Sequence, residues 1–103
     1  MSAKHLVTAI IYDRRGKVLA IGQNNYLKSH PLQAKHGALV GEPYKIFLHS
    51  EIHAITRCPD ISKAHRIAVF RYGKDGRPML AAPCAICQSA IAATPIKVIE
   101  YTA

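Results

Sequence analysis

Two cysteines three residues apart are the strongest chemical signal in the chain. Cys84 and Cys87 follow Pro83, where the sequence predicts the start of a helix. Residues at positions i and i+3 of a helix face the same way, and the positive potential at a helix N-terminus stabilises thiolates. Such a pair can be a redox couple or half of a zinc site, and the spacing can also arise by chance. Because the chain has three cysteines, an odd number, a disulfide framework is not expected.

His49 and Glu51 stand at the predicted start of another helix and could complete a metal site. Two thiolates and one imidazole leave the fourth tetrahedral position of a zinc ion to water, which is the arrangement of catalytic sites. His49 and Glu51 lie about 200° apart around a helix, so they can converge only at its end, where Glu51 could carry protons. His53 and Cys58 are rival ligands, for which we favour packing roles.

These two half-motifs together resemble a known family. The pattern His49-x-Glu51 followed by Pro83-Cys84-x-x-Cys87 is similar to the signature of the zinc-dependent cytidine and deoxycytidylate deaminases, a superfamily that includes the tRNA adenosine deaminases. The resemblance implies that His49, Cys84 and Cys87 bind Zn²⁺. It also implies that Glu51 passes a proton from water to the base and then to the leaving amine.

The same resemblance implies how a substrate is held and converted. Gly22-Gln23-Asn24 resembles a family element whose Asn contacts the substrate sugar, which assigns that role to Asn24. The backbone around Ser50, which replaces a commoner alanine, and around Ala82 would help to hold the base. The implied reaction is hydrolytic deamination of a cytosine nucleotide to its uracil counterpart with release of ammonia, and an adenine base is an alternative. Three aromatic residues could stack on the base or simply pack: Tyr26, Tyr44 and Phe47.

Apolar and turn patterns indicate the elements that must position these residues. We predict strands over residues 5–12, 18–22, 66–72 and 96–101 and helices over 49–57 and 83–93, with Pro83 in the first turn of its helix. The first two strands form a hairpin, and the second helix links two strands that should be parallel. We expect a single domain over residues 1–103. Between Asn25 and Phe47 we expect a long loop that can include one short helix.

The predicted fold class is α/β, and the resemblance implies a minimal cytidine deaminase-like α/β/α sandwich. Its mixed sheet would have four strands in the order 2-1-3-4, with the zinc ligands on the helices. Because only two helices are evident, one face of the sheet would be incompletely covered and the fourth strand would form an open edge. We therefore expect a homo-oligomer, either a dimer or a multiple of dimers.

The charge balance bears on the partner. The chain carries 14 Lys and Arg against 6 Asp and Glu, a formal charge of +8, which favours a phosphate-bearing partner over a merely solubilising charge. A phosphorylated nucleotide satisfies this, and so does single-stranded nucleic acid, which makes a polynucleotide deaminase the alternative enzyme. A catalytically silent zinc- or nucleic-acid-binding module is a further alternative, against which Glu51 argues. The basic residues expected to rim the substrate pocket are Lys28, His30, Lys35, His36 and Lys45.

Composition also limits where the protein acts. Half of the residues are apolar, which excludes a disordered chain, and no apolar run approaches the roughly 18 residues of a membrane span. The N-terminal residues do not resemble a signal peptide. We therefore expect a cytoplasmic protein with no membrane partner.

Overall fold

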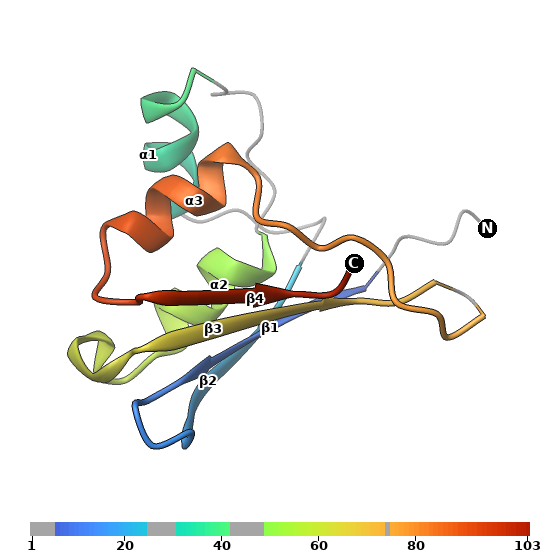
Figure 1. Cartoon of the computed structure of the whole chain (residues 1–103). Helices are drawn as coiled ribbons and strands as arrows, with labels where there is room; N and C mark the ends of the chain where they lie inside the picture. Colours follow the sequence, from blue (N-terminus) through green and yellow to red (C-terminus); the bar gives the residue numbers. More distant parts are fainter. Residues whose placement is uncertain (1–5, 25–30, 42–48, 74) are drawn as a thin grey trace.

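The computed structural model describes residues 6–24, 31–41, 49–73 and 75–103 (Figure 1). Its strands are β1 (Val7–Tyr12), β2 (Val18–Gln23), β3 (Arg66–Arg71) and β4 (Val98–Tyr101). Its helices are α1 (Pro31–Leu39), α2 (Ser50–Arg57) and α3 (Ala85–Ala92), and a single 3₁₀ turn, η1, covers Ile61–Lys63. Within these residues, no helix is long and apolar enough to cross a lipid bilayer.

The four strands form one mixed sheet in the order β2-β1-β3-β4. β1 is antiparallel to β2 and to β3, whereas β3 and β4 are parallel. The β1–β2 turn is closed by Asp13, whose carboxylate accepts hydrogen bonds from the backbone N–H groups of Arg15 and Lys17. Gly16 completes it with a φ of +86°, which favours glycine. The predicted hairpin, the parallel crossover and the strand order are confirmed.

The described helices all lie on one side of the sheet (Figure 1). α2 packs against β1, β2 and β3, while α1 packs on α3. The core between sheet and helices combines Ile11, Ile67 and Val69 of the strands with Ala54 of α2 and Ile91 of α3. The described residues therefore form two layers of a small α/β domain, and the cytidine deaminase-like α/β/α sandwich stays a prediction. The outer face keeps apolar side chains in solvent, with exposures of 46% for Val18, 48% for Ile21 and 38% for Val98.

One prediction about helices is met and one needs correction. The short helix allowed between residues 25 and 47 is α1, a helix of nine residues, whose polar residues Gln33 and His36 are buried against the rest of the protein. Pro83 does not lie in the first turn of its helix, because α3 begins at Ala85 and Cys84 is the N-cap. The proline therefore restricts the residue that precedes it, Ala82, on the approach to the helix.

A close approach between β2 and α2 fixes the position of the second helix. Gly22 is buried where a Cβ atom would collide with the backbone nitrogen of Ala54 and the carbonyl oxygen of Ser50. Only glycine lets the strand and the helix come this close without displacement. The C-terminal end of β2 is thereby held beside the N-terminal end of α2.

Candidate metal centre

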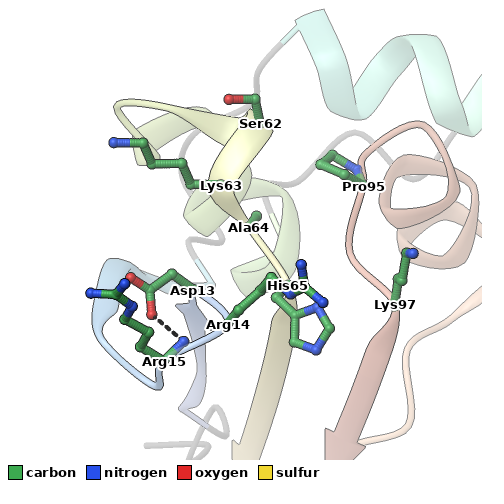
Figure 2. Close-up of a pocket in the computed structure, with 9 residues that line it drawn as sticks. All are labelled: Asp13, Arg14, Arg15, Ser62, Lys63, Ala64, His65, Pro95 and Lys97. Carbon is green, nitrogen blue, oxygen red and sulfur yellow. Dashed lines mark hydrogen bonds between the residues drawn. The ribbon is translucent and has the colours of Figure 1, made fainter.

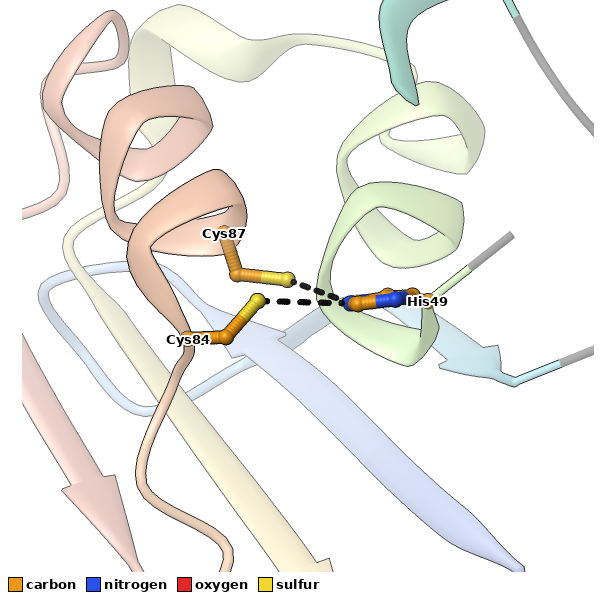
Figure 3. Close-up of side chains that lie close together, drawn as sticks. All are labelled: His49, Cys84 and Cys87. Carbon is orange, nitrogen blue, oxygen red and sulfur yellow. Dashed lines mark hydrogen bonds between the residues drawn. The ribbon is translucent and has the colours of Figure 1, made fainter. Parts of the chain in front are cut away.

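Two helix N-termini face each other and each presents a metal-ligating residue at its N-cap. His49 caps α2 and Cys84 caps α3, both with extended backbone (φ −85°, ψ 154° and φ −71°, ψ 174°). Neither side chain makes a capping hydrogen bond to its own helix. Both point instead into the space between the two helices, where Cys87 from the first turn of α3 meets them (Figure 3).

The three ligand atoms lie at distances that suit one metal ion. His49 Nδ1 lies 3.3 Å from Cys87 Sγ and 3.5 Å from Cys84 Sγ, and all three atoms are within 4.8 Å of one another. A nitrogen and a sulfur that share a tetrahedral zinc ion are separated by about 3.6 Å. The geometry therefore fits a metal ion, and an imidazole with two thiols is a donor set typical of zinc.

The electrostatics of the cluster also favour a cation. A hydrogen bond from the Cys87 thiol, followed by contact with His49, lowers the pKa of Cys84 to about 3. The same hydrogen bond and burial hold the pKa of Cys87 well above its ordinary value, and the nearby Glu51 carboxylate adds to this effect. The cluster thus readily carries one thiolate but resists a second negative charge. A divalent cation would remove that resistance, which is why the donor chemistry fits a metal.

Glu51 lies beside the cluster, close enough for its charge to affect Cys87. It is the second residue of α2 and its side chain is 6% exposed. The hydroxyl of Ser50 donates a hydrogen bond of 2.5 Å to its Oε1. His49 lies at the N-cap and not within the helix, so the divergence expected on a regular helix does not separate it from Glu51. The structure brings the predicted proton carrier to the predicted ligands.

Asn24 is positioned by the strand next to α2. Its Oδ1 accepts a hydrogen bond of 3.0 Å from the backbone N–H of Val7, and its own N–H donates to the carbonyl of Val7. His53 holds the same region, because its Nδ1 lies 3.0 Å from the backbone nitrogen of Gln23. His53 therefore joins α2 to β2 and is outside the metal cluster. The contact of Asn24 with a sugar stays a prediction.

Gln33 is a contributor that the sequence reasoning missed. It lies in α1, is fully buried, and accepts a hydrogen bond of 3.2 Å from the backbone N–H of His49. The contact ties the N-cap of α2 to the neighbouring helix. In the sequence, the only signal of this role is a polar glutamine between the apolar residues Leu32 and Ala34.

The remaining predicted residues have four different outcomes. His36 is not on a rim, since it is 3% exposed and its Nδ1 lies 2.8 Å from Ser89 Oγ; burial, then the nearby charge of Lys35, lowers its pKa. Cys58 is half-buried at the edge of the core and is outside the metal cluster. Ala82 is exposed, two residues before Cys84. Six predicted residues fall outside the described residues, namely Tyr26, Lys28, His30, Tyr44, Lys45 and Phe47.

Comparison with known proteins adds no family assignment. No family model matches the chain, and a search of curated proteins finds no match. The case for a metal centre therefore depends on the geometry and chemistry of His49, Cys84 and Cys87.

Proposed function

We propose that this chain is a zinc-dependent hydrolytic deaminase that converts a cytosine nucleotide to its uracil counterpart with release of ammonia. The observation that carries the proposal is Glu51, a buried carboxylate placed beside an imidazole and two thiols. A metal site that only stabilises a fold needs no proton carrier, and so a carboxylate held next to its ligands is not expected there. The order of the two half-motifs along the chain, which resembles that of the zinc deaminases, supports the same conclusion.

The ligand set supports an open metal position. Within the described residues, three side chains and no fourth gather in the cluster, and catalytic zinc sites commonly have three protein ligands. Zinc bound there would supply a Lewis acid that lowers the pKa of water toward 7. A redox couple is the rival interpretation of the two cysteines. Contact of both sulfurs with the His49 ring supports metal ligation instead.

Glu51 is suited to moving the proton. Its carboxylate would accept a proton and deliver it first to the ring nitrogen and then to the leaving amine. Ser50 fixes the orientation of this carboxylate through a hydrogen bond to Oε1, which leaves Oε2 for the exchange. Burial of the pair keeps bulk water from competing for the proton.

The substrate assignment depends on Asn24 and on charge. A hydrogen bond from the Val7 backbone fixes the Asn24 carboxamide. This carboxamide lies at the end of β2 that adjoins α2, where its NH₂ group could donate a hydrogen bond to a sugar hydroxyl. The formal charge of +8 supports a phosphorylated substrate. A base within single-stranded nucleic acid is the alternative substrate, because the same charge suits a polynucleotide.

A panel assay tests the proposal. The zinc-loaded protein is incubated with cytosine and adenine nucleosides, nucleotides and short oligonucleotides while ammonia release is measured. We expect turnover of a cytosine nucleotide, and an absence of ammonia with every member of the panel would refute the enzyme. Turnover of oligonucleotides alone would select the polynucleotide alternative.

Matched variants separate metal binding from proton transfer. Glu51→Gln should retain zinc, measured by plasma emission spectroscopy, and lose about 10²–10⁴-fold in turnover. Cys84→Ala should lose both zinc and turnover, whereas Cys58→Ala, which removes a thiol outside the cluster, should lose neither. Full turnover by Glu51→Gln would refute the proposed proton path.

We also propose that the chain self-associates. The outer face of the sheet exposes Val18, Ile21 and Val98, and every residue of the edge strand β4 is exposed. A second copy would cover apolar surface of this kind. Light scattering at micromolar concentration should give the mass of a dimer or of a multiple of dimers, and the mass of a monomer would refute self-association.

A further inference from the structure

A cationic cavity lies at the end of the sheet away from the metal centre (Figure 2). Its lining comes from three separate segments: the β1–β2 turn, the η1 region before β3, and the residues leading into β4. The volume of about 470 Å³ is within the range of small-ligand sites, about 300–1,000 Å³. The residues that line it are Asp13, Arg14, Arg15, Ser62, Lys63, Ala64, His65, Pro95 and Lys97.

The charge of this cavity is strongly one-sided. Arg14 and Arg15 come from the hairpin turn, Lys63 from η1, and Lys97 from the segment before β4. Figure 2 shows Arg14 reaching toward His65, with Lys97 across from them. Four permanently cationic side chains therefore surround one volume that contains a single carboxylate. The mutual repulsion of such charges is relieved when an anion binds between them.

The two carboxylates near the cavity offset the charge of its cations only in part. Asp13 interacts electrostatically with Arg15, and Asp60 with Lys63, but neither carboxylate forms a salt bridge with these cations among the described residues. Asp13 accepts hydrogen bonds from the backbone N–H groups of Arg15 and Lys17, and these bonds lower its pKa. Asp60, beside Lys63, accepts from both the N–H and the hydroxyl of Ser62. The hydrogen bonds of each carboxylate are thus made within its own turn, and within the described part of the chain neither carboxylate pairs with Arg14 or Lys97.

The salt bridges of the described residues do not involve the cations of the cavity either. Among the residues that the structure describes, the salt bridges are those of Arg66 with Glu100 and of Arg77 with Asp75. Neither pair includes a residue that lines the cavity. Four cations face two carboxylates at most, so the cavity keeps a net positive charge that an external anion can neutralise.

The position of the cavity separates it from the metal centre. Its residues follow the end of β1 and precede the starts of β3 and β4, whereas the metal ligands lie near the end of β2 and the start of β1. The two regions are thus separated by most of the length of a six-residue strand, about 20 Å. A mononucleotide in contact with the metal cluster would not extend to the cavity.

We propose that this cavity binds a compact polyphosphate, such as the diphosphate group of a small ligand. Guanidinium and ammonium groups are the usual partners of phosphate oxygens. Grooves for single-stranded nucleic acid add aromatic side chains on which bases stack, and the described lining contains no Phe, Tyr or Trp. Cations gathered from three segments around one volume suit a compact anion better than an extended strand.

Calorimetric titration of the intact zinc-loaded protein with inorganic pyrophosphate tests this site. We expect saturable binding of the wild-type chain, weakened about tenfold or more in the double variant Arg14→Ala/Lys97→Ala. The control Lys17→Ala/Arg77→Ala removes the same charge from residues outside the lining and should bind as the wild type does. Equal weakening in both double variants would show a general charge effect and overturn the site.

Four further measurements check the interpretation. The single variant Lys63→Gln, at an exposed position, should also weaken pyrophosphate binding, and circular dichroism should show that each variant is folded. Zinc content is measured in parallel, because pyrophosphate could bind the metal itself; binding that survives the Arg14→Ala/Lys97→Ala change unaltered would overturn the site. Binding of a twelve-residue oligothymidylate without binding of pyrophosphate would overturn it as well, in favour of a strand.

Discussion

The two ends of the sheet bring together side chains of opposite character. Where β2 ends and α2 begins, an imidazole, two thiols and a carboxylate meet. Where β1 ends and β3 and β4 begin, the side chains that meet include two guanidinium groups, two ammonium groups and an imidazole. The first group is half-buried or buried and ordered by contacts with helix ends. The second is mostly exposed and is ordered by turns. One small sheet thus places possible ligands of a metal cation at one end and cationic hydrogen-bond donors for an anion at the other.

The difference teaches how each kind of site depends on the rest of the molecule. Metal ligands need separations correct to a few tenths of an ångström, and so they lie on packed helices whose positions the core fixes. A cationic cavity tolerates movement, because Coulomb attraction changes slowly with distance. The metal end should therefore be far more sensitive to small structural changes than the cavity end.

Loss of a metal ligand should have the largest effect. Cys84→Ala removes one of the three donors, so the chain should lose zinc and the stabilisation that zinc provides, about 4 kcal/mol when free zinc is 1,000 times its dissociation constant. Thermal unfolding of the variant with and without zinc measures this difference. Lys97→Ala at the cavity end should keep the zinc-dependent increase in melting temperature. If both variants kept it, His49, Cys84 and Cys87 would not form the metal site.

Adding a methyl group at either end should have unequal effects. Gly22→Ala would drive a Cβ into the backbone of α2, which can be relieved only by moving the helix; we expect a loss of about 3 kcal/mol and weaker zinc binding. At the cavity end, the Cβ added by Gly16→Ala meets no atom within 4 Å. Its only cost in stability comes from the positive φ of this position, about 1 kcal/mol. Denaturant unfolding of the two variants compares them. Equal losses would contradict the proposed close packing of β2 on α2.

The two ends also differ in how far they could be predicted from sequence. His49, Cys84 and Cys87 carry a local signal, because metal chemistry needs particular residue types at short spacings, and the structure brings them together as expected. The cavity has no such signal, since Arg14, Lys63 and Lys97 are far apart in the chain and become neighbours only through the strand order. Exposed lysines and arginines are common everywhere, so charge alone did not indicate the cavity.

Helix α1 shows the same limit within the fold. Pro31 and Gly37 indicate turns, and no clear apolar stripe crosses the segment, so local pattern favours a loop. The helix forms nevertheless, with Gln33 bonded to the N-cap of α2 and His36 to Ser89 of α3. Tertiary contacts override local preference here, and single-sequence reasoning has no access to them.

Removal of the Gln33 contact should have a smaller effect than the Gly22→Ala change. Gln33→Leu keeps the volume of the side chain but leaves the His49 N–H without this acceptor, which should cost about 2 kcal/mol of stability. Zinc affinity should fall by about tenfold, because His49 is then less well oriented. Competition with a chromogenic chelator measures the affinity. Pyrophosphate binding at the cavity serves as the internal control and should not change.

The pH dependence of stability should show the smallest effect, and it too should come from the metal side of the molecule. Burial lowers the pKa of His36 in the folded protein below its ordinary value of 6.5. The unfolded chain therefore binds a proton more readily than the folded one, and stability is complete above about pH 6.5 and declines as the pH falls through the folded pKa. His36→Gln, which can still bond to Ser89, removes the titration and should flatten the profile in this range. His65→Gln at the cavity end changes a partly exposed ring and should leave the decline in place, so an equal flattening in both variants would mean that the burial of His36 does not cause it.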